Sequence, residues 1–259
     1  MLYEISKVKI CVSDLLCVFK AMRRFTIEEQ SADCSIMAMD HSVHCHGIES
    51  FDIHESHTQI FRIGQDLMLM DREWKHGGIL YPFFQQESVS TFLLQAFYTH
   101  AVRRNTIQLH ASLIEHSGFG IAFLGPSGIG KTTQAELWNR YRGARIINGD
   151  IVFVQEEEDG FWGIGTPWHG SSPYCENRRV RLKAMVVLKQ AEKNRIRILE
   201  GYEKVREVSG SVFYPRWAED GMELCLHTLD RLLRGLPVYE LSCAPEEGAV
   251  SLLEKSIYG

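Results

Sequence analysis

Residues 125–133 read Gly125-Pro126-Ser127-Gly128-Ile129-Gly130-Lys131-Thr132-Thr133 and directly follow the apolar run 120–124. Nucleotide phosphates are bound chiefly by backbone N–H groups, so glycines permit an approach that a Cβ would block. Lys131 adds a positive charge, and the hydroxyl of Thr132 is suited to a magnesium ion. The apolar run predicts a strand, and 133–141 predicts a helix whose positive end faces the loop. The whole stretch therefore predicts a nucleotide-phosphate site.

Composition sets limits on the rest of the chain. The 259 residues, 45% of them hydrophobic, suffice for one large domain or two smaller ones. A net charge of -5 without a basic cluster argues against a nucleic-acid partner. Seven cysteines without a CxxC pair, together with the lack of an apolar run near membrane-spanning length, favour a reduced cytoplasmic protein without a membrane partner.

The chain divides into three predicted segments. Apolar residues mostly alternate over 2–12 and 60–70, which predicts half-buried strands in a β-rich N-terminal lobe over 1–86. A bridging helix is expected over 87–105, because apolar residues recur there at three- and four-residue spacing. In the remaining segment, 106–259, strands over 107–115 and 119–124 should pair as a hairpin around Ser117-Gly118.

A carboxylate follows the glycine-rich stretch. The segment 144–155 predicts a strand that Asn148-Gly149-Asp150 interrupts, and an acidic turn is expected over 156–160. Phosphoryl transfer needs a carboxylate to hold a metal, directly or through water, or to accept the proton of an attacking hydroxyl. Asp150 is therefore a candidate, and the alternative is that these three residues form only a turn.

The segment 163–173 contains too many glycines, prolines and small polar residues for regular structure. Such a loop suits a flexible lid that excludes water from a reacting phosphoryl group. The alternative is a surface loop that is anchored in the core by its tryptophan. As a lid, its substrate-facing residues would be Thr166, Pro167, Trp168, His169 and Gly170.

Two further groups of side chains have alternative interpretations. Arg179, Arg181 and Lys183 alternate along a predicted strand, so they form either a solvated face or a phosphate-facing one, in which Arg179 and Arg181 would contact substrate. His110 ends an apolar strand and is either functional or a satisfied polar group. The histidines at 41, 44, 46, 54 and 57 lack the usual zinc spacing, and we interpret them as exposed strand residues.

Several motifs occur in a fixed order over about 105–255. They are His110-Ala111-Ser112, the stretch 125–133, Asn148-Gly149-Asp150, the loop Gly165-Thr166-Pro167-Trp168-His169-Gly170, Asn177, Leu182-Lys183-Ala184 and Pro237-Val238-Tyr239-Glu240-Leu241. This series resembles the C-terminal catalytic domain of HPr kinase/phosphorylase and its kinase relatives. The relatives include serine kinases of lasso-peptide and other peptide-modification systems.

The resemblance implies an α/β fold, with a phosphate-loop kinase domain on a mixed β-sheet as in HPr kinase and phosphoenolpyruvate carboxykinase, preceded here by the smaller β-rich lobe. It places the family's histidine on His110, its metal-binding hydroxyl on Thr132 and the second of its paired aspartates on Asp150. Gly149 replaces the first aspartate. Either Asp150 is then the general base while Thr132 and the phosphates hold magnesium, or His110 or His169 takes part.

The expected function is transfer of a phosphoryl group from ATP, with Mg²⁺, to a hydroxyl of a peptide or small molecule, with serine favoured. The expected catalytic residues are Asp150, Lys131, His110 and His169, and Thr132 and Asp150 would bind the metal. HPr kinases also suggest a homo-oligomer. Two alternatives remain: a catalytically silent, nucleotide-gated binding partner of a peptide-modification system, and a simple ATPase.

Overall fold

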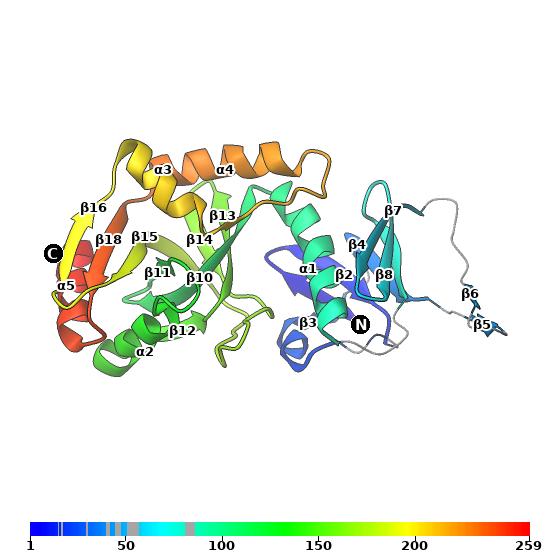
Figure 1. Cartoon of the computed structure of the whole chain (residues 1–259), viewed down its shortest axis with the longest axis horizontal. Coiled ribbons are helices and arrows are strands. Elements are labelled where there is room, and N and C mark those ends of the chain that lie inside the picture. The colour runs from blue at the N-terminus through cyan, green and yellow to red at the C-terminus, as the bar shows by residue number, and fades with distance from the viewer. Residues whose placement is uncertain are drawn as a thin grey trace. The chain divides into compact units, whose positions relative to one another are not determined.

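The computed structural model describes residues 1–14, 16, 18–29, 31–39, 42–44, 48–50, 57–80 and 86–259. These residues form two compact units, Met1–Ala101 and Val102–Gly259. Both units contain a mixed sheet, so the chain has a mixed α/β architecture (Figure 1). None of the helices in the described ranges combines the length and apolar character needed to span a bilayer.

The N-terminal unit is built around a seven-stranded sheet. Its central strands β2, β4 and β9 are parallel to one another, and the other pairs are antiparallel. Val8, Ile10 and Val12 of β2 are buried and alternate with half-buried residues, as the sequence pattern predicts. The strand order is β3 (Thr26–Ile27), β1 (Leu2–Ile5), β2 (Val8–Val12), β4 (Cys34–Ala38), β9 (His76–Leu80), β8 (Asp66–Asp71) and β7 (His57–Ile63).

Four other described elements belong to this unit. They are the 3-10 helix η1 (Lys20–Phe25), the separate pair β5 (Ser42–His44) and β6 (Ile48–Ser50), and the helix α1 (Gln86–Val102). The helix ends earlier than predicted, because a turn follows it and Asn105 takes a left-handed φ of 51°. Almost all of α1 belongs to the N-terminal unit, and the boundary between the two units falls at its last turn.

The C-terminal unit contains the second sheet and four helices among its described residues. The sheet follows the order β11-β10-β13-β14-β15-β18-β16, β12 and β17 pair with β10, and β11 also pairs in parallel with β15. The strands are β10 (Thr106–His116), β11 (Phe119–Leu124), β12 (Arg145–Asn148), β13 (Ile151–Glu157), β14 (Gly160–Ile164), β15 (Arg179–Gln190), β16 (Arg195–Ile198), β17 (Val212–Phe213) and β18 (Val238–Cys243). The helices are α2 (Lys131–Arg142), α3 (Gly201–Ser209), α4 (Gly221–Gly235) and α5 (Glu247–Tyr258).

A tight hairpin delivers the chain to the glycine-rich loop. Ser117 and Gly118 have φ angles of 51° and 79°, and two successive positive φ angles favour a turn that matches the twist of paired strands. β10 and β11 pair around this turn, with Ala111 opposite Leu124, which confirms the predicted hairpin. The loop that follows Leu124 therefore starts beside the middle of β10.

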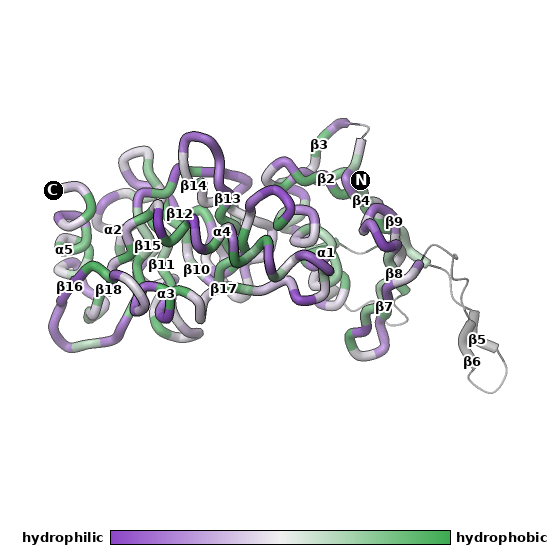
Figure 2. The backbone as a smooth tube through the Cα atoms, turned by 90° about the horizontal axis from the view of Figure 1, so that it is seen from above, coloured by the Kyte–Doolittle hydropathy of each residue, from purple (hydrophilic) through white to green (hydrophobic). Residues whose placement is uncertain are grey.

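The core of this unit holds α2 and α5 against the sheet. Phe123 of β11, Trp138 of α2 and Leu253 of α5 are fully buried members of one apolar cluster. Figure 2 shows hydrophobic residues along the central strands of this unit and hydrophilic ones in its outer loops. Because β11 and α2 are packed in one core, the loop between them has fixed ends.

The predicted interruption of the strand 144–155 is confirmed. β12 ends at Asn148 and β13 begins at Ile151, so Gly149 and Asp150 form the short connection. The predicted acidic turn over 156–160 is shorter than expected. β13 continues to Glu157, because Glu156 and Glu157 pair with Phe161 and Gly160 of β14.

Candidate functional site

The loop between β11 and α2 depends on its glycines. Gly125, Gly128 and Gly130 have φ angles of 138°, 78° and 110°, which residues with a Cβ rarely adopt. Gly130 is the N-cap of α2 and offers no capping side chain to the first N–H groups of the helix. The loop and the start of α2 thus present backbone donors and the positive end of a helix dipole.

A cavity of about 340 Å³ lies against this loop. Its lining comes from the loop and α2, from the β10 strand, from the β12–β13 connection and from the loop after β14. Among the described residues that line it, Asp150 is the only carboxylate and Lys131 the only lysine. The lining residues are His110, Ser127, Gly128, Gly130, Lys131, Thr132, Thr133, Gly149, Asp150, Ser171, Ser172 and Pro173.

Lys131 is bound to the loop itself. Its side chain is only 6% exposed, and its Nζ donates hydrogen bonds to the carbonyl oxygens of Gly125 at 3.0 Å and Pro126 at 3.1 Å. Burial lowers the pKa of Lys131, and the nearby charge of Asp150 partly opposes that effect. The site therefore concentrates a positive charge beside the backbone donors of the loop.

Two serines hold the loop in place. Ser112 Oγ is buried and donates to the carbonyl oxygen of Lys131 at 2.9 Å. Ser211 Oγ accepts a hydrogen bond from Gly125 N at 3.2 Å, and the Ser211 carbonyl accepts one from His110 N at 2.8 Å. Ser211 thus links the glycine-rich loop to β10. Ser211 lies far along the chain in no recognisable motif, so no local sequence pattern indicates this role.

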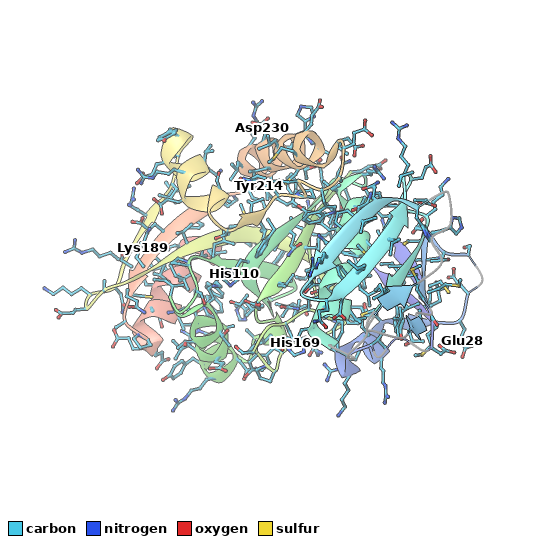
Figure 3. All side chains as sticks on the ribbon, turned by 45° about the vertical axis from the view of Figure 1, so that its right-hand side comes forward. Glu28, His110, His169, Lys189, Tyr214 and Asp230 are labelled. Atoms are coloured by element: carbon cyan, nitrogen blue, oxygen red, sulfur yellow. The ribbon has the colours of Figure 1, made fainter. Side chains whose placement is uncertain are left out.

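His110 and Asp150 form a pair within the cavity. His110 Nε2 lies 2.9 Å from Asp150 Oδ1, because β10 and β13 are neighbours and His110 is opposite Ile151. Asn148 Oδ1 accepts hydrogen bonds from the backbone N–H groups of Asp150 at 2.9 Å and Ile151 at 3.1 Å. His110 therefore contacts the carboxylate itself, and Asn148 fixes the backbone that carries it. His110 and His169 are labelled in Figure 3 on β10 and on the loop after β14.

Asn148 also anchors the loop that follows β14. Its side chain is fully buried, and Nδ2 donates to the carbonyl oxygens of Thr166 at 3.0 Å and Trp168 at 3.1 Å. Thr166 Oγ1 in turn donates to the Ile151 carbonyl at 2.8 Å. A single asparagine thereby fixes both the Asp150 backbone and the loop that faces it.

We expect Asn148→Ala to lower the free energy of unfolding by about 3 kcal/mol, because several buried backbone groups would lose their partners at once. Urea denaturation monitored by circular dichroism measures the change. Asn139→Ala is the matched control: Asn139 Nδ2 donates to the Ala144 carbonyl, at 2.8 Å, and the loss of that bond should cost about 1 kcal/mol. Equal losses for the two variants would contradict the role assigned to Asn148.

The loop 165–173 differs in part from the predicted flexible lid. Thr166, Pro167 and Trp168 are buried, with Thr166 at 0% and Trp168 at 5% exposure, because Asn148 holds their backbone inside the unit. This half matches the alternative of a loop anchored by its tryptophan. The other half, from Gly170 to Pro173, reaches the cavity through Ser171, Ser172 and Pro173.

His169 does not line the cavity. Its Nδ1 contacts the carbonyl oxygen of Ser172, so the ring stabilises the loop from within. Gly170 lies directly against the carboxylate of Asp150, with a left-handed φ of 55°. Gly170 of the predicted loop therefore lies next to Asp150.

Arg179 and Arg181 are not brought to the glycine-rich loop. They start β15, which is parallel to β11, whereas the loop follows the end of β11. Arg179 stacks over Trp162, with its guanidinium carbon 4.4 Å from the ring centroid, and pairs with Glu157 at 2.8 Å. Neither arginine occurs among the residues described as lining the cavity, so the structure does not place them at it.

A second, larger cavity of about 620 Å³ adjoins the first. The two share Gly128, Gly130 and Thr133. Six of its other lining residues are apolar, namely Ile129, Leu188, Ala191, Cys243, Ala244 and Pro245, and the remaining four, Gln134, Lys189, Gln190 and Glu192, are polar or charged. An apolar hollow thus lies beside a polar one, with the glycine-rich loop between them.

No cluster of three or more histidine, cysteine or acidic side chains gathers as a metal site within the described part of the chain. His41, Cys45, His46 and His54 of the N-terminal segment lie outside the described residues. Any divalent cation at the cavity would therefore rely on Asp150, hydroxyl groups, water and the ligand's own oxygens.

The chain is similar to solved structures, but not to known families or curated proteins by sequence. No protein-family model matches the sequence, and no curated protein matches it significantly. Among solved structures, the HPr(Ser) kinase/phosphatase from Coxiella burnetii is similar over 57% of this chain and 86% of that chain. The identity is 13% and the TM-score 0.32, so the similarity to this kinase is distant.

Proposed function

We propose that the chain is a magnesium-dependent kinase that transfers the terminal phosphoryl group of ATP to a hydroxyl of a peptide or small molecule. The observation that carries this proposal is the His110–Asp150 pair, 2.9 Å apart, in the same cavity as Lys131 and the glycine-rich loop. A polarised carboxylate facing a phosphate-binding surface suits activation of an acceptor hydroxyl.

The two adjoining cavities suit the two ends of a nucleotide. The polar cavity would take the phosphates, where Lys131 would exchange its bonds to the Gly125 and Pro126 carbonyls for bonds to phosphate oxygens. The neighbouring hollow beside Ile129 and Leu188 would take the base. Most ligand pockets combine an apolar body with a few placed polar groups, which supports this division.

The donor set fits magnesium. Mg²⁺ prefers oxygen ligands, keeps several waters and commonly binds one or two carboxylates together with substrate phosphates. Thr132 Oγ1 and the Asp150 carboxylate line the same cavity. Thr132 Oγ1 would hold the ion directly, and Asp150 would hold it through a water, which leaves a carboxylate oxygen free to accept a proton. When bound, the ion would offset negative charge on the phosphates.

In the proposed reaction, the acceptor hydroxyl loses its proton to Asp150 as its oxygen attacks the terminal phosphorus. The bond between that phosphorus and the bridging oxygen breaks, and ADP leaves. His110, bound to the other side of the carboxylate, keeps Asp150 oriented. Lys131 and the loop N–H groups neutralise charge on the transferred group.

The test is incubation of the purified chain with γ-labelled ATP, Mg²⁺ and serine-containing peptides, followed by mass spectrometry. We expect one added phosphate on a serine and ADP formation that requires the peptide. ADP formation that is independent of any acceptor would indicate an ATPase instead. Nucleotide binding without ADP formation would indicate a silent binding partner, and lack of nucleotide binding would refute all three.

A further inference from the structure

The side chain of Ser172 lies where a side chain at position 149 would otherwise be. A Cβ at position 149 would lie 1.8 Å from Ser172 Oγ and 2.4 Å from Ser172 Cβ, far inside van der Waals contact. The same point lies 3.8 Å from Thr132 Oγ1. Glycine at 149 thus leaves room that the Ser172 side chain fills, and the hydroxyls of Ser172 and Thr132 lie near a common point.

A second glycine, Gly170 of the loop, lies against the side chain of Asp150 in the β12–β13 connection. A Cβ at Gly170 would lie 2.3 Å from Asp150 Oδ2, so the absent side chain admits the carboxylate. Between these contacts, Ser172 N donates to the His169 carbonyl at 3.0 Å. The segment 169–172 and the connection 149–150 are therefore interlocked, which fixes the position of Ser172 relative to Asp150.

The Ser172 hydroxyl has hydrogen-bonding capacity beyond the contact that holds it. The side chain is 8% exposed, and Oγ accepts a hydrogen bond from Tyr174 N at 3.3 Å. A serine hydroxyl has one donor hydrogen and two acceptor lone pairs, so a lone pair and the hydrogen are left for a further partner. Ser172 also lines the cavity that contains Thr132 and Asp150.

We infer that Ser172 Oγ supplies an oxygen to the divalent cation, or to one of its waters, in place of any side chain at position 149. This inference rests on the proposed nucleotide site. A cavity whose described lining has one carboxylate leaves most positions of an octahedral ion to hydroxyls, water and phosphate. Ser172 Oγ lies near the same point as Thr132 Oγ1, which would fill one of those coordination positions.

The experiment measures nucleotide affinity by calorimetry, with Mg²⁺ and in EDTA, for the wild type and Ser172→Ala. We expect the gain in affinity that Mg²⁺ provides to fall about tenfold in Ser172→Ala, the loss typical of a bond to a charged group. Affinity in EDTA should change less than about twofold. Ser256→Ala is the control, because Ser256 Oγ donates to the Leu252 carbonyl within α5 and Ser256 does not line the cavity.

A double variant, Gly149→Asp with Ser172→Gly, tests whether an oxygen ligand supplied from position 149 can replace the one from Ser172. Removal of the Ser172 side chain makes room at 149, so the new carboxylate should restore the magnesium-dependent gain to at least the wild-type level. A double variant without that gain would contradict the placement of the cation beside this point. Thermal melting of each variant establishes that it is folded.

The two proposals fail differently. If Ser172→Ala keeps the full magnesium-dependent gain, the role of Ser172 is wrong while the nucleotide site stands. If the wild type binds no nucleotide under either condition, the proposed function fails and the inference fails with it.

Discussion

Replacement of Lys131 by methionine should reduce phosphoryl transfer by about 10³-fold, near the upper end of what the loss of one charge-stabilising group costs. Methionine approximates the length of lysine and is apolar, so it suits a side chain that is 6% exposed. It removes the positive charge that would neutralise the transferred group. Initial rates of peptide phosphorylation measure the effect, and unchanged transfer would remove Lys131 from the mechanism.

The same variant loses the hydrogen bonds of Lys131 Nζ to the Gly125 and Pro126 carbonyls, and its stability relative to the wild type, measured by thermal melting, should fall as the pH rises. Burial lowers the pKa of Lys131, so the folded state holds the ammonium less favourably than the unfolded chain does. That cost is full below the lowered pKa and disappears as the pH rises toward the ordinary lysine value. Any stability advantage of Lys131→Met should therefore shrink at alkaline pH. Lys193→Met, which removes an exposed lysine between β15 and β16, is the control.

The features that could be predicted from the sequence depend on local chemistry. Ser117-Gly118 favours a tight turn wherever it lies between apolar strands, and the glycines at 125, 128 and 130 are needed for positive φ angles that the loop adopts. Asn148-Gly149-Asp150 interrupts a strand for the same local reason. These signals place the loop, the helix after it and Asp150 without knowledge of the fold.

The features that could not be predicted depend on contacts between distant segments. Ser211 Oγ contacts the Gly125 N–H because β17 pairs with β10, and no local sequence pattern predicts that pairing. Alternation put Arg179 and Arg181 on one face, yet it could not indicate that β15 runs parallel to β11 and leaves them away from the loop. The burial of Thr166 follows from Asn148, whose side chain direction the sequence does not specify.

Asp150→Asn should reduce the rate of transfer by about 10³-fold, within the range that a general base contributes. Asparagine keeps the size of the side chain and one oxygen that can face His110 Nε2, so the fold should survive. It loses the negative charge that would accept the acceptor's proton and bind Mg²⁺. The turnover number and the magnesium dependence of nucleotide binding are both measured, and a variant unchanged in each would refute the role of Asp150.

Comparison with His110→Gln decides which of the two residues is the base. If Asp150 accepts the proton and His110 only orients it, His110→Gln should lose about 10-fold to 10²-fold, less than Asp150→Asn. The double variant Asp150→Asn, His110→Gln should then be no slower than Asp150→Asn alone, because the effects of substitutions in residues that act as one unit do not add. A larger loss in His110→Gln than in Asp150→Asn would assign the proton transfer to His110. The carboxylate, 2.9 Å from its ring, would then be the orienting partner.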